Sequence, residues 1–287
     1  MGHWGKIANI IIFLCFLFRL CYNSRTFEKG ESGDPMKYYV TADIHSYYSP
    51  LREALAAAGY YEDKGPHKLV ILGDLFDRGH EAAEVQAFVL DLMERDEIIL
   101  IKGNHEDLFV EFATTDHGIS YSHHVSNGTF DTALQLTGID KTMATIRNYD
   151  FADAMKETPY FKIIIPAMKD YYETKRFIFV HGWIPCIRER NKQYSYVTAW
   201  RDSDSREWMA ARWINGMKAA NDGVIEPGKT IVCGHWHTSY GHSVLNHTCS
   251  EFGPDANFNP YYGTGIIALD GCTAHSGIVN VITVEDE

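Results

Sequence analysis

The chain alternates short apolar runs with amphipathic segments over most of its length. Several runs of four to six residues end at Gly or at a polar residue, which is typical of buried strands. They cover residues 37–42, 69–72, 98–101, 177–180 and 230–233. Between the first three runs, residues 50–58 and 81–95 carry apolar side chains at helical spacing. We expect Ser49 as the N-cap of the first helix and Pro50 as its first residue. This order predicts a parallel sheet with right-handed crossovers.

Later segments predict two more helices and a second sheet. One helix is expected near residues 106–113 and another over residues 205–220. The second helix has an apolar stripe that we expect to pack in the core, formed by Trp208, Met209, Trp213 and Met217. Two apolar runs near the C-terminus predict strands of a second, more antiparallel sheet. These runs cover residues 266–269 and 279–284.

One domain is expected to account for residues 36–287. The stretch from about 107 to 175 is longer than the core needs, and it contains helical segments near residues 129–136 and 141–149. We expect this helical insertion to form a cap beside the functional site, because loops over a scaffold often carry specificity. The alternative is an ordinary helical insertion.

Residues 1–35 are expected to lie outside that domain. Residues 7–18 form an apolar run that is shorter than the roughly 20 residues of a membrane span. Either this run is an export signal or a membrane anchor, or residues 1–35 are a translated extension and the natural start is Met36. The expected localisation is cytoplasmic, and the alternative is a protein exported or tethered to a membrane through residues 7–18.

The composition indicates a globular chain with an acidic surface. Of its 287 residues 45% are hydrophobic and 22% are charged, which is enough for one substantial core. The formal net charge is −12, and the Lys and Arg residues are scattered. We therefore expect no nucleic-acid partner, since binding to a phosphate backbone needs clustered basic residues. The six cysteines form no C-x-x-C pair, which argues against a zinc knuckle and favours a reducing compartment.

Candidate chemistry lies at the ends of the five apolar runs. Each run is followed within three residues by Asp, Asn or His, and ligands of open α/β sheets bind outside the carboxyl ends of the strands. In Asp43-Ile44-His45, alternate residues of an extended segment would point the same way. Oxygen and imidazole ligands without thiolates suit Mn, Fe, Zn or Mg. The candidate residues are Asp43, His45, Asp74, Asp77, Arg78, Asn104, His105, His181, His235 and His237.

The motifs D-x-H, G-D-x-x-D-R-G, G-N-H-E, H-G and G-H occur in this order between positions 43 and 237. As an ordered set they resemble those of the calcineurin-like metallophosphoesterases. The Arg-Gly pair and the Glu of G-N-H-E are similar to the phosphoprotein phosphatase branch, which includes bacterial and phage Ser/Thr phosphatases and diadenosine tetraphosphatase. The resemblance implies an α/β fold whose central β-sandwich has one mostly parallel sheet and one mixed or antiparallel sheet, flanked by helices.

The resemblance also implies two divalent metal ions, with Mn expected and Fe, Zn or Mg as alternatives. The matching ligands are Asp43, His45 and the bridging Asp74 for the first ion, and Asp74, Asn104, His181 and His235 for the second. His237 follows the G-H-x-H pattern of the wider superfamily, which typical phosphoprotein phosphatases lack, and we expect it to reach the first ion.

Catalytic roles follow from the same resemblance, in which a hydroxide bridging the two ions attacks phosphorus in line. Arg78 would hold two phosphoryl oxygens, a geometry that its planar guanidinium provides. His105 would protonate the leaving alkoxide, and Asp77 would orient His105. The phosphatase branch uses an additional Arg on the phosphate, which either Arg201 or Arg212 matches.

The insertion carries one further similarity. Residues 126–132 resemble an N-G-G-x-x-T element of bacterial phosphatases, with Thr129 in place of the second Gly.

The implied function is hydrolysis of phosphoric monoesters, with phosphoserine and phosphothreonine in proteins as the expected substrates. An alternative is a nucleotide hydrolase similar to bis(5'-nucleosyl)-tetraphosphatase, because Gly234-His235-Trp236 resembles that version of the motif. A phosphodiesterase is favoured by His237, and an inactive metal-binding scaffold is the remaining alternative. The expected partner is a phosphorylated protein or a small phosphoester, with a membrane involved only if the N-terminal apolar run acts as an anchor.

Overall fold

A computed structural model describes residues 36–115, 121–146 and 148–286. The apolar run 7–18 and both interpretations of residues 1–35 lie outside these residues. Within the described ranges no helix has the length and apolar character that would let it cross a membrane.

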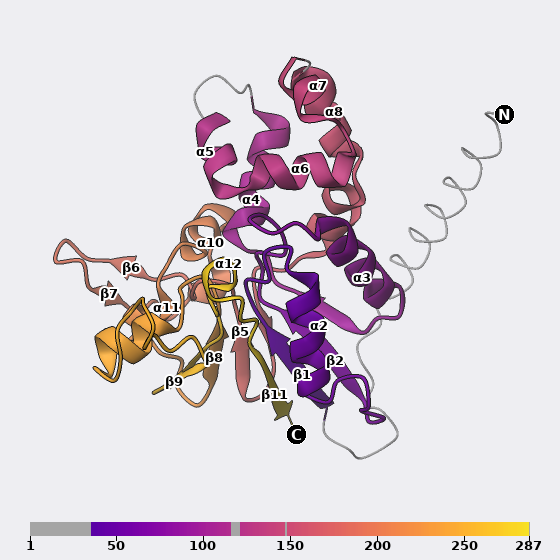
Figure 1. The fold of residues 1–287 in the computed structure, drawn as a ribbon. Helices are drawn as coiled ribbons and strands as arrows, with labels where there is room; N and C mark the ends of the chain where they lie inside the picture. Colours follow the sequence, from indigo (N-terminus) through magenta and orange to yellow (C-terminus); the bar gives the residue numbers. More distant parts are fainter. Residues whose placement is uncertain (1–35, 116–120, 147, 287) are drawn as a thin grey trace. The chain divides into compact units, whose positions relative to one another are not determined.

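The first sheet has the strand order β11-β1-β2-β3 (Figure 1). Its strands are β1 (Met36–Thr41), β2 (His67–Ile71), β3 (Ile98–Leu100) and β11 (Val281–Asp286). The first three strands are parallel, which confirms the predicted parallel sheet. Strand β11 runs antiparallel to β1, from the pair Met36–Asp286 to the pair Thr41–Val281. The prediction that this last strand joins the second sheet is wrong, because it instead pairs with the free edge of β1.

The second sheet has the order β4-β5-β8-β10-β9. Its strands are β4 (Tyr172–Glu173), β5 (Phe177–Phe179), β8 (Thr230–Cys233), β10 (Ile266–Ala268) and β9 (Tyr261–Gly263). Strands β5, β8 and β10 are parallel, and only the edge strands β4 and β9 are antiparallel. A separate hairpin of β6 (Ile187–Arg188) and β7 (Tyr194–Ser195) projects from the domain.

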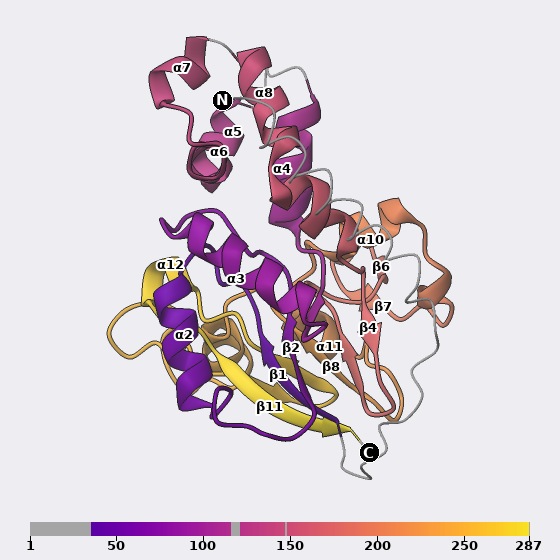
Figure 2. The same cartoon turned by 90° about the vertical axis from the view of Figure 1, so that its right-hand side faces the viewer.

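The two sheets pack face to face and carry helices on their outer faces (Figure 2). Alternation along each strand explains this arrangement, because successive side chains point to opposite faces. Val40 and Val70 lie in the core between the sheets together with Val232 from the second sheet. Tyr39 and Ile178 point outward, into separate cores under the helices of the first and second sheet. The predicted β-sandwich with flanking helices is confirmed.

The helices divide into three groups. The first sheet is covered by α2 (Tyr48–Ala57) and α3 (Ala82–Glu94). The insertion follows α4 (Asn104–Thr114) and contains α5 (Tyr121–Asn127), α6 (Thr129–Thr137), α7 (Lys141–Ile146), α8 (Asn148–Glu157), the π-helix η1 (Tyr160–Ile164) and α9 (Ile165–Ala167). The C-terminal half contains η2 (Trp200–Asp202), α10 (Ser205–Ala211), α11 (Gly216–Asn221), η3 (Gly241–Leu245) and α12 (Thr273–Ser276).

Two helix predictions need correction. Helix α2 begins at Tyr48, and Ser49 bonds the Glu81 carboxylate through its backbone N–H and its hydroxyl instead of capping the helix. The expected helix 205–220 is two helices, because Asn215 leaves the helical conformation and accepts a hydrogen bond from the backbone N–H of Lys218 as the N-cap of α11. The break changes which side chains face the core. Trp208 and Met217 are buried as expected, whereas Met209 and Trp213 are exposed.

Candidate metal centre

The loops that follow β1 and β2 lie side by side and deliver the first candidate ligands. The backbone N–H of His45 donates to the carbonyl of Asp74 at 3.0 Å, and that of Asp43 donates to Gly73 at 3.3 Å. Asp43, His45 and Asp74 have φ values of 51°, 46° and 51°. The expectation of an extended Asp43-Ile44-His45 segment is therefore wrong. These left-handed conformations persist because the two loops bond each other, and such backbone strain clusters at functional sites.

Asp74 belongs to two groups of possible metal ligands. Within each group the ligand atoms lie within 4.8 Å of one another. The groups are His45, Asp74 and His105, and Asp74, His181 and His235. Asp74 Oδ2 lies 3.9 Å from His45 Nε2, whereas Oδ1 lies 3.4 Å from His181 Nε2. The two carboxylate oxygens thus face different groups, as a bridging ligand requires.

Backbone carbonyls fix the histidine rings. His45 Nδ1 lies 2.8 Å from the carbonyl of Phe76, and His181 Nδ1 lies 2.6 Å from that of Leu72. A carbonyl only accepts, so each Nδ1 carries the proton and each Nε2 offers a lone pair. Burial lowers the pKa of both rings, that of His45 to about 3, and keeps them neutral. Burial also lowers the pKa of His235 to about 3. Neutral imidazoles are the form that binds metals.

The second group contains acceptors that face one another. His181 Nε2 lies 2.8 Å from Asn104 Oδ1 as well as 3.4 Å from Asp74 Oδ1. With the His181 proton on Nδ1, three lone-pair atoms converge there, and a cation would satisfy all three. The residues therefore fit a divalent ion, and their oxygen and nitrogen donors suit Mn, Fe, Zn or Mg.

Two predicted ligands lie beside these groups instead of within them. The Asp43 carboxylate accepts the backbone N–H of His235 at 2.9 Å, and burial raises its pKa. His237 contacts Ser239 Oγ through Nδ1 at 2.9 Å and Glu251 through Nε2 at 3.4 Å. The structure thus brings His45, Asp74, His181 and His235 together with Asn104 but leaves Asp43 and His237 beside them. Metal binding by all seven residues stays a prediction.

His105, Asp77 and Arg78 form a connected cluster next to Asp74. His105 Nδ1 lies 2.6 Å from Asp77 Oδ2, and its Nε2 lies 3.3 Å from an Arg78 guanidinium nitrogen. His105 and Asp77 are buried, whereas Arg78 is exposed. Burial alone would lower the pKa of His105, but the charge of Asp74 and the hydrogen bond to Asp77 raise it. This histidine therefore differs from the neutral ones around it, because its surroundings favour the protonated form.

Helix α6 of the insertion supports this cluster. Thr129 Oγ donates to Asp77 Oδ2 at 2.8 Å, and the backbone N–H of Asp77 donates to Thr132 Oγ at 2.9 Å. A Cβ at residue 128 would lie 2.4 Å from the backbone nitrogen of Arg78, so only Gly fits there. The segment that resembles the bacterial N-G-G-x-x-T element thus contacts the left-handed turn at Asp77 and Arg78, whose φ values are 74° and 66°.

Both candidates for the additional phosphate-binding Arg bind carboxylates. Arg201 makes a two-point contact with Glu173 at 2.6 and 2.8 Å and also bonds Glu226 at 2.8 Å. The buried Arg212 donates to Asp107 at 2.6 Å and to Asp170. A role of either residue on phosphate stays a prediction.

Glu106 and Tyr160 form a buried pair whose role the sequence analysis missed. The Glu106 carboxylate accepts the backbone N–H groups of Asp74 (3.0 Å), Leu75 (3.0 Å) and Gly103 (2.7 Å), and the Tyr160 hydroxyl (3.0 Å). Burial raises the pKa of Glu106 to about 7. This one side chain links the loop that carries Asp74 to the first turn of α4, which carries Asn104. No local sequence signal points to Tyr160.

Asp270 is a second residue that the sequence analysis missed. It follows β10 and accepts the backbone N–H of Cys272 at 2.7 Å, and burial raises its pKa to about 6. The sequence contains a signal for this residue, because Asp270 directly follows the apolar run 266–269, just as the other candidate ligands follow the apolar runs of their strands.

Comparisons with known proteins show the family to which the chain belongs. The model of the family described as calcineurin-like phosphoesterase matches residues 36–265. A candidate serine/threonine-protein phosphatase of Caenorhabditis elegans is 37% identical over 78 residues, which are 26% of this chain and 20% of that protein. The asymmetrical bis(5'-nucleosyl)-tetraphosphatase PrpE of Geobacillus sp. (strain WCH70) is 34% identical over 76 residues, 24% of this chain and 31% of that protein. These matches thus span less than a third of either relative.

Among solved structures, a cold-active protein tyrosine phosphatase has a similar fold. Its TM-score is 0.50 at 16% identity, and the match covers 88% of this chain and 74% of that one. At this identity the likeness concerns the fold alone. The family match over residues 36–265 places the chain in the calcineurin-like phosphoesterase family of hydrolytic enzymes.

Proposed function

We propose that this chain is a metal-dependent phosphomonoesterase that acts on phosphoproteins, with phosphoserine and phosphothreonine as its substrates. One observation carries the proposal. A histidine held by a carboxylate and an exposed arginine, His105 with Asp77 and Arg78, lies beside Asp74, which both ligand groups share, and His105 itself belongs to the first group. A protein that only bound metal would have no use for this cluster.

The ligand groups would hold two divalent ions through Asp74, His45, His181, His235 and Asn104, with Asp43 and His237 as further candidates. Such ions supply a water of lowered pKa and neutralise the charge on the phosphoryl oxygens. Arg78 is exposed beside them, so its guanidinium can bind two phosphoryl oxygens and orient the ester.

His105 is placed to give a proton to the leaving oxygen. Asp77 accepts the Nδ1 proton, which orients the ring, while Nε2 faces the Arg78 guanidinium, a group that only donates. A phosphoryl group bound by Arg78 would free Nε2 to carry the proton that it gives to the leaving oxygen. The charge of Asp74 and the hydrogen bond to Asp77 raise the pKa of His105 against the effect of burial, and this favours the protonated form that a general acid needs. An alkoxide is a poor leaving group, so its protonation matters most for esters of serine and threonine.

Phosphate release in Mn²⁺ by the full chain tests the proposal. Three substrates are compared at equal concentration: a phosphothreonine peptide, diadenosine tetraphosphate and a bis-aryl phosphodiester. The proposal predicts the highest kcat/KM for the peptide. Metal-loaded protein that hydrolyses none of them would contradict the enzymatic function and favour a metal-binding scaffold.

A second candidate is hydrolysis of dinucleoside polyphosphates. The match to the bis(5'-nucleosyl)-tetraphosphatase and the exposed Trp236 beside His235 favour it. Preference for diadenosine tetraphosphate in the same assay would select this function. The location of His237, paired with Glu251, lends no support to a phosphodiesterase.

A further inference from the structure

Exposed tryptophans lie beside the second ligand group. Trp183, Trp200 and Trp208 are at most 3% exposed, as expected of large apolar side chains. Trp213 is 48% exposed and Trp236 is 37% exposed. Packing in the core therefore does not account for this second pair.

Both exposed tryptophans flank one metal-ligand candidate. The Trp213 ring centroid lies 5.7 Å from that of His235 in an edge-to-face arrangement, and the Trp236 centroid lies 6.0 Å from it. The aromatic surface continues beyond Trp236, which stacks at 5.9 Å on His237, and His237 lies 4.9 Å from Phe252. Phe252 is itself 51% exposed. The surface thus starts at the ligand group and extends outward from it.

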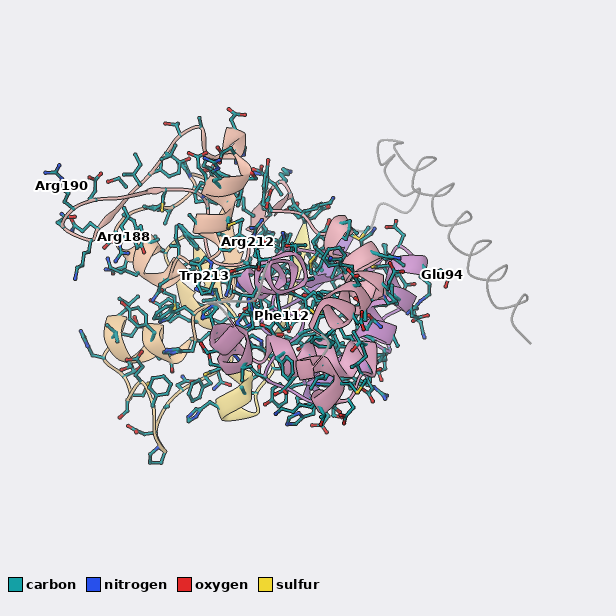
Figure 3. All side chains as sticks on the ribbon, turned by 90° about the horizontal axis from the view of Figure 1, so that it is seen from above. Glu94, Phe112, Arg188, Arg190, Arg212 and Trp213 are labelled. Atoms are coloured by element: carbon teal, nitrogen blue, oxygen red, sulfur yellow. The ribbon has the colours of Figure 1, made fainter. Side chains whose placement is uncertain are left out.

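The backbone holds the Trp213 position close to the ligands. Trp213 follows α10, and its backbone N–H donates to the carbonyl of Ala210 at 3.1 Å. The end of α10 packs tightly against the residue after His181, since a Cβ at Gly182 would lie 2.5 Å from the carbonyl of Ala211. In Figure 3, Arg212 and Trp213 lie between the hairpin that carries Arg188 and Arg190 and the helices around Phe112.

We propose that Trp213 and Trp236 bind a planar aromatic group that the substrate carries beside its reacting phosphoryl group. This inference rests on the proposed phosphomonoesterase activity and widens its substrates from phosphoserine and phosphothreonine to phosphoric esters that carry an aromatic ring. Exposed indole faces stack on planar rings, and such stacking tolerates differences between rings because every aromatic ring has a π face. The ring can be the phenyl group of a phosphotyrosine or the base of a nucleotide.

Matched esters test the surface. Phenyl phosphate and propyl phosphate are compared as substrates of the wild type, Trp213→Ala and Trp236→Ala. Each substitution is expected to lower kcat/KM for phenyl phosphate about ten-fold and to leave propyl phosphate within about two-fold. Tyr262→Ala, which removes a 62% exposed aromatic side chain elsewhere on the protein, is expected to leave kcat/KM unchanged for both esters. Equal losses on both esters, or no loss on either, would overturn the proposal.

Binding of analogues that cannot be hydrolysed tests the aromatic surface independently of the proposed reaction. Calorimetry on the Mn²⁺-loaded full chain compares phenylphosphonate with propylphosphonate. Tighter binding of phenylphosphonate that is lost in Trp213→Ala and restored in Trp213→Phe supports the surface, even if no ester is hydrolysed and the proposed function fails. Equal affinities for phenylphosphonate and propylphosphonate would overturn the proposed aromatic binding, even if the enzyme turns over esters rapidly.

Two further ligands identify the source of the ring. A phosphotyrosine peptide and adenosine monophosphate are compared in the same variants. The ligand whose affinity falls about ten-fold in both variants is the aromatic group that the surface binds. If the affinity of neither falls, the proposal is overturned.

Discussion

Asp74 is the residue on which both ligand groups depend. Its oxygens face different histidines, and its pKa is lowered although burial alone would raise it, because its interactions with the surrounding histidines favour the ionised form. The carboxylate therefore stays ionised inside the protein. The histidine rings around Asp74 differ in their hydrogen-bond partners. His45 and His181 bond backbone carbonyls through Nδ1 and so offer a lone pair on Nε2, whereas the bond of His105 to Asp77 favours a protonated ring.

The role of His105 as an acid predicts a dependence on the leaving group. His105→Asn is expected to lower kcat by about 10²- to 10⁴-fold on a phosphothreonine peptide, whose leaving alkoxide needs a proton. The loss on p-nitrophenyl phosphate should be much smaller, because nitrophenolate leaves without protonation. The measurement is kcat for both substrates together with the Mn content of the purified variant.

His247→Asn is the matched control, because His247 is exposed and its φ of 56° suits Asn. It should leave both rates unchanged. If His105→Asn instead loses a metal ion, or loses activity equally on both substrates, His105 is a ligand of the first group and not the acid.

At the scale of elements, the insertion is bonded to the site at two points. Helix α6 contacts Asp77 through Thr129 and Thr132, and Tyr160 of η1 bonds Glu106. The first contact joins the insertion to the loop after β2, and the second joins it to the first turn of α4, which follows β3. The insertion is thus part of what positions the ligands.

Tyr160→Phe tests this coupling by removing one hydroxyl group. Buried Glu106 then loses a donor, so the free energy of unfolding should fall by about 1 to 3 kcal/mol. The affinity for Mn²⁺ should fall roughly ten-fold, as is usual when the partner that orients a ligand is lost. Urea unfolding and metal titration measure the two effects, with exposed Tyr61→Phe as the control. Unchanged metal affinity would mean that Tyr160 supports only the fold.

A second inter-element contact predicts a pH dependence of stability. Glu173 of β4 accepts hydrogen bonds from Arg201 and pairs with Lys229 at 2.9 Å, and the Arg201 hydrogen bonds lower its pKa from 4.5 to about 2 despite partial burial. A lowered folded-state pKa stabilises the protein fully above pH 4.5, and this contribution is lost as the pH falls toward 2.

Glu173→Gln should therefore lower the free energy of unfolding by about 1 to 3 kcal/mol at pH 7. The difference from the wild type should shrink steadily between pH 4.5 and the acid limit of folding. Urea unfolding from pH 7 to pH 3 measures it, and Glu53→Gln on the exposed face of α2 serves as the control. A difference that stays constant with pH would contradict the account of this contact.

At the scale of the whole molecule, the sandwich brings the ends of two sheets to one place. The loops after β1, β2, β5 and β8 lie at the same edge, so ligands that are 190 residues apart, His45 and His235, enter adjoining groups. Two sheets are needed because the first supplies the His45 group and the second supplies His181 and His235.

Much of this could be predicted because the short apolar run of each strand and the polar residue after it are local signals. Asp74, His181 and His235 were found in that way. The left-handed turns at Asp43 and His45 could not be predicted, because they depend on hydrogen bonds between two loops. The same holds for Tyr160, whose partner Glu106 is distant in sequence, and for Trp213, whose exposure follows from the helix break at Asn215.

The most direct test of the account is the number of Mn²⁺ ions bound per chain, measured by calorimetric titration of the wild type and Asp74→Asn. Two ions are expected for the wild type, because each ligand group would hold one. Asp74→Asn should lose high-affinity binding at both sites, since both groups share this carboxylate. A single ion in the wild type, or two tightly bound ions in Asp74→Asn, would contradict it.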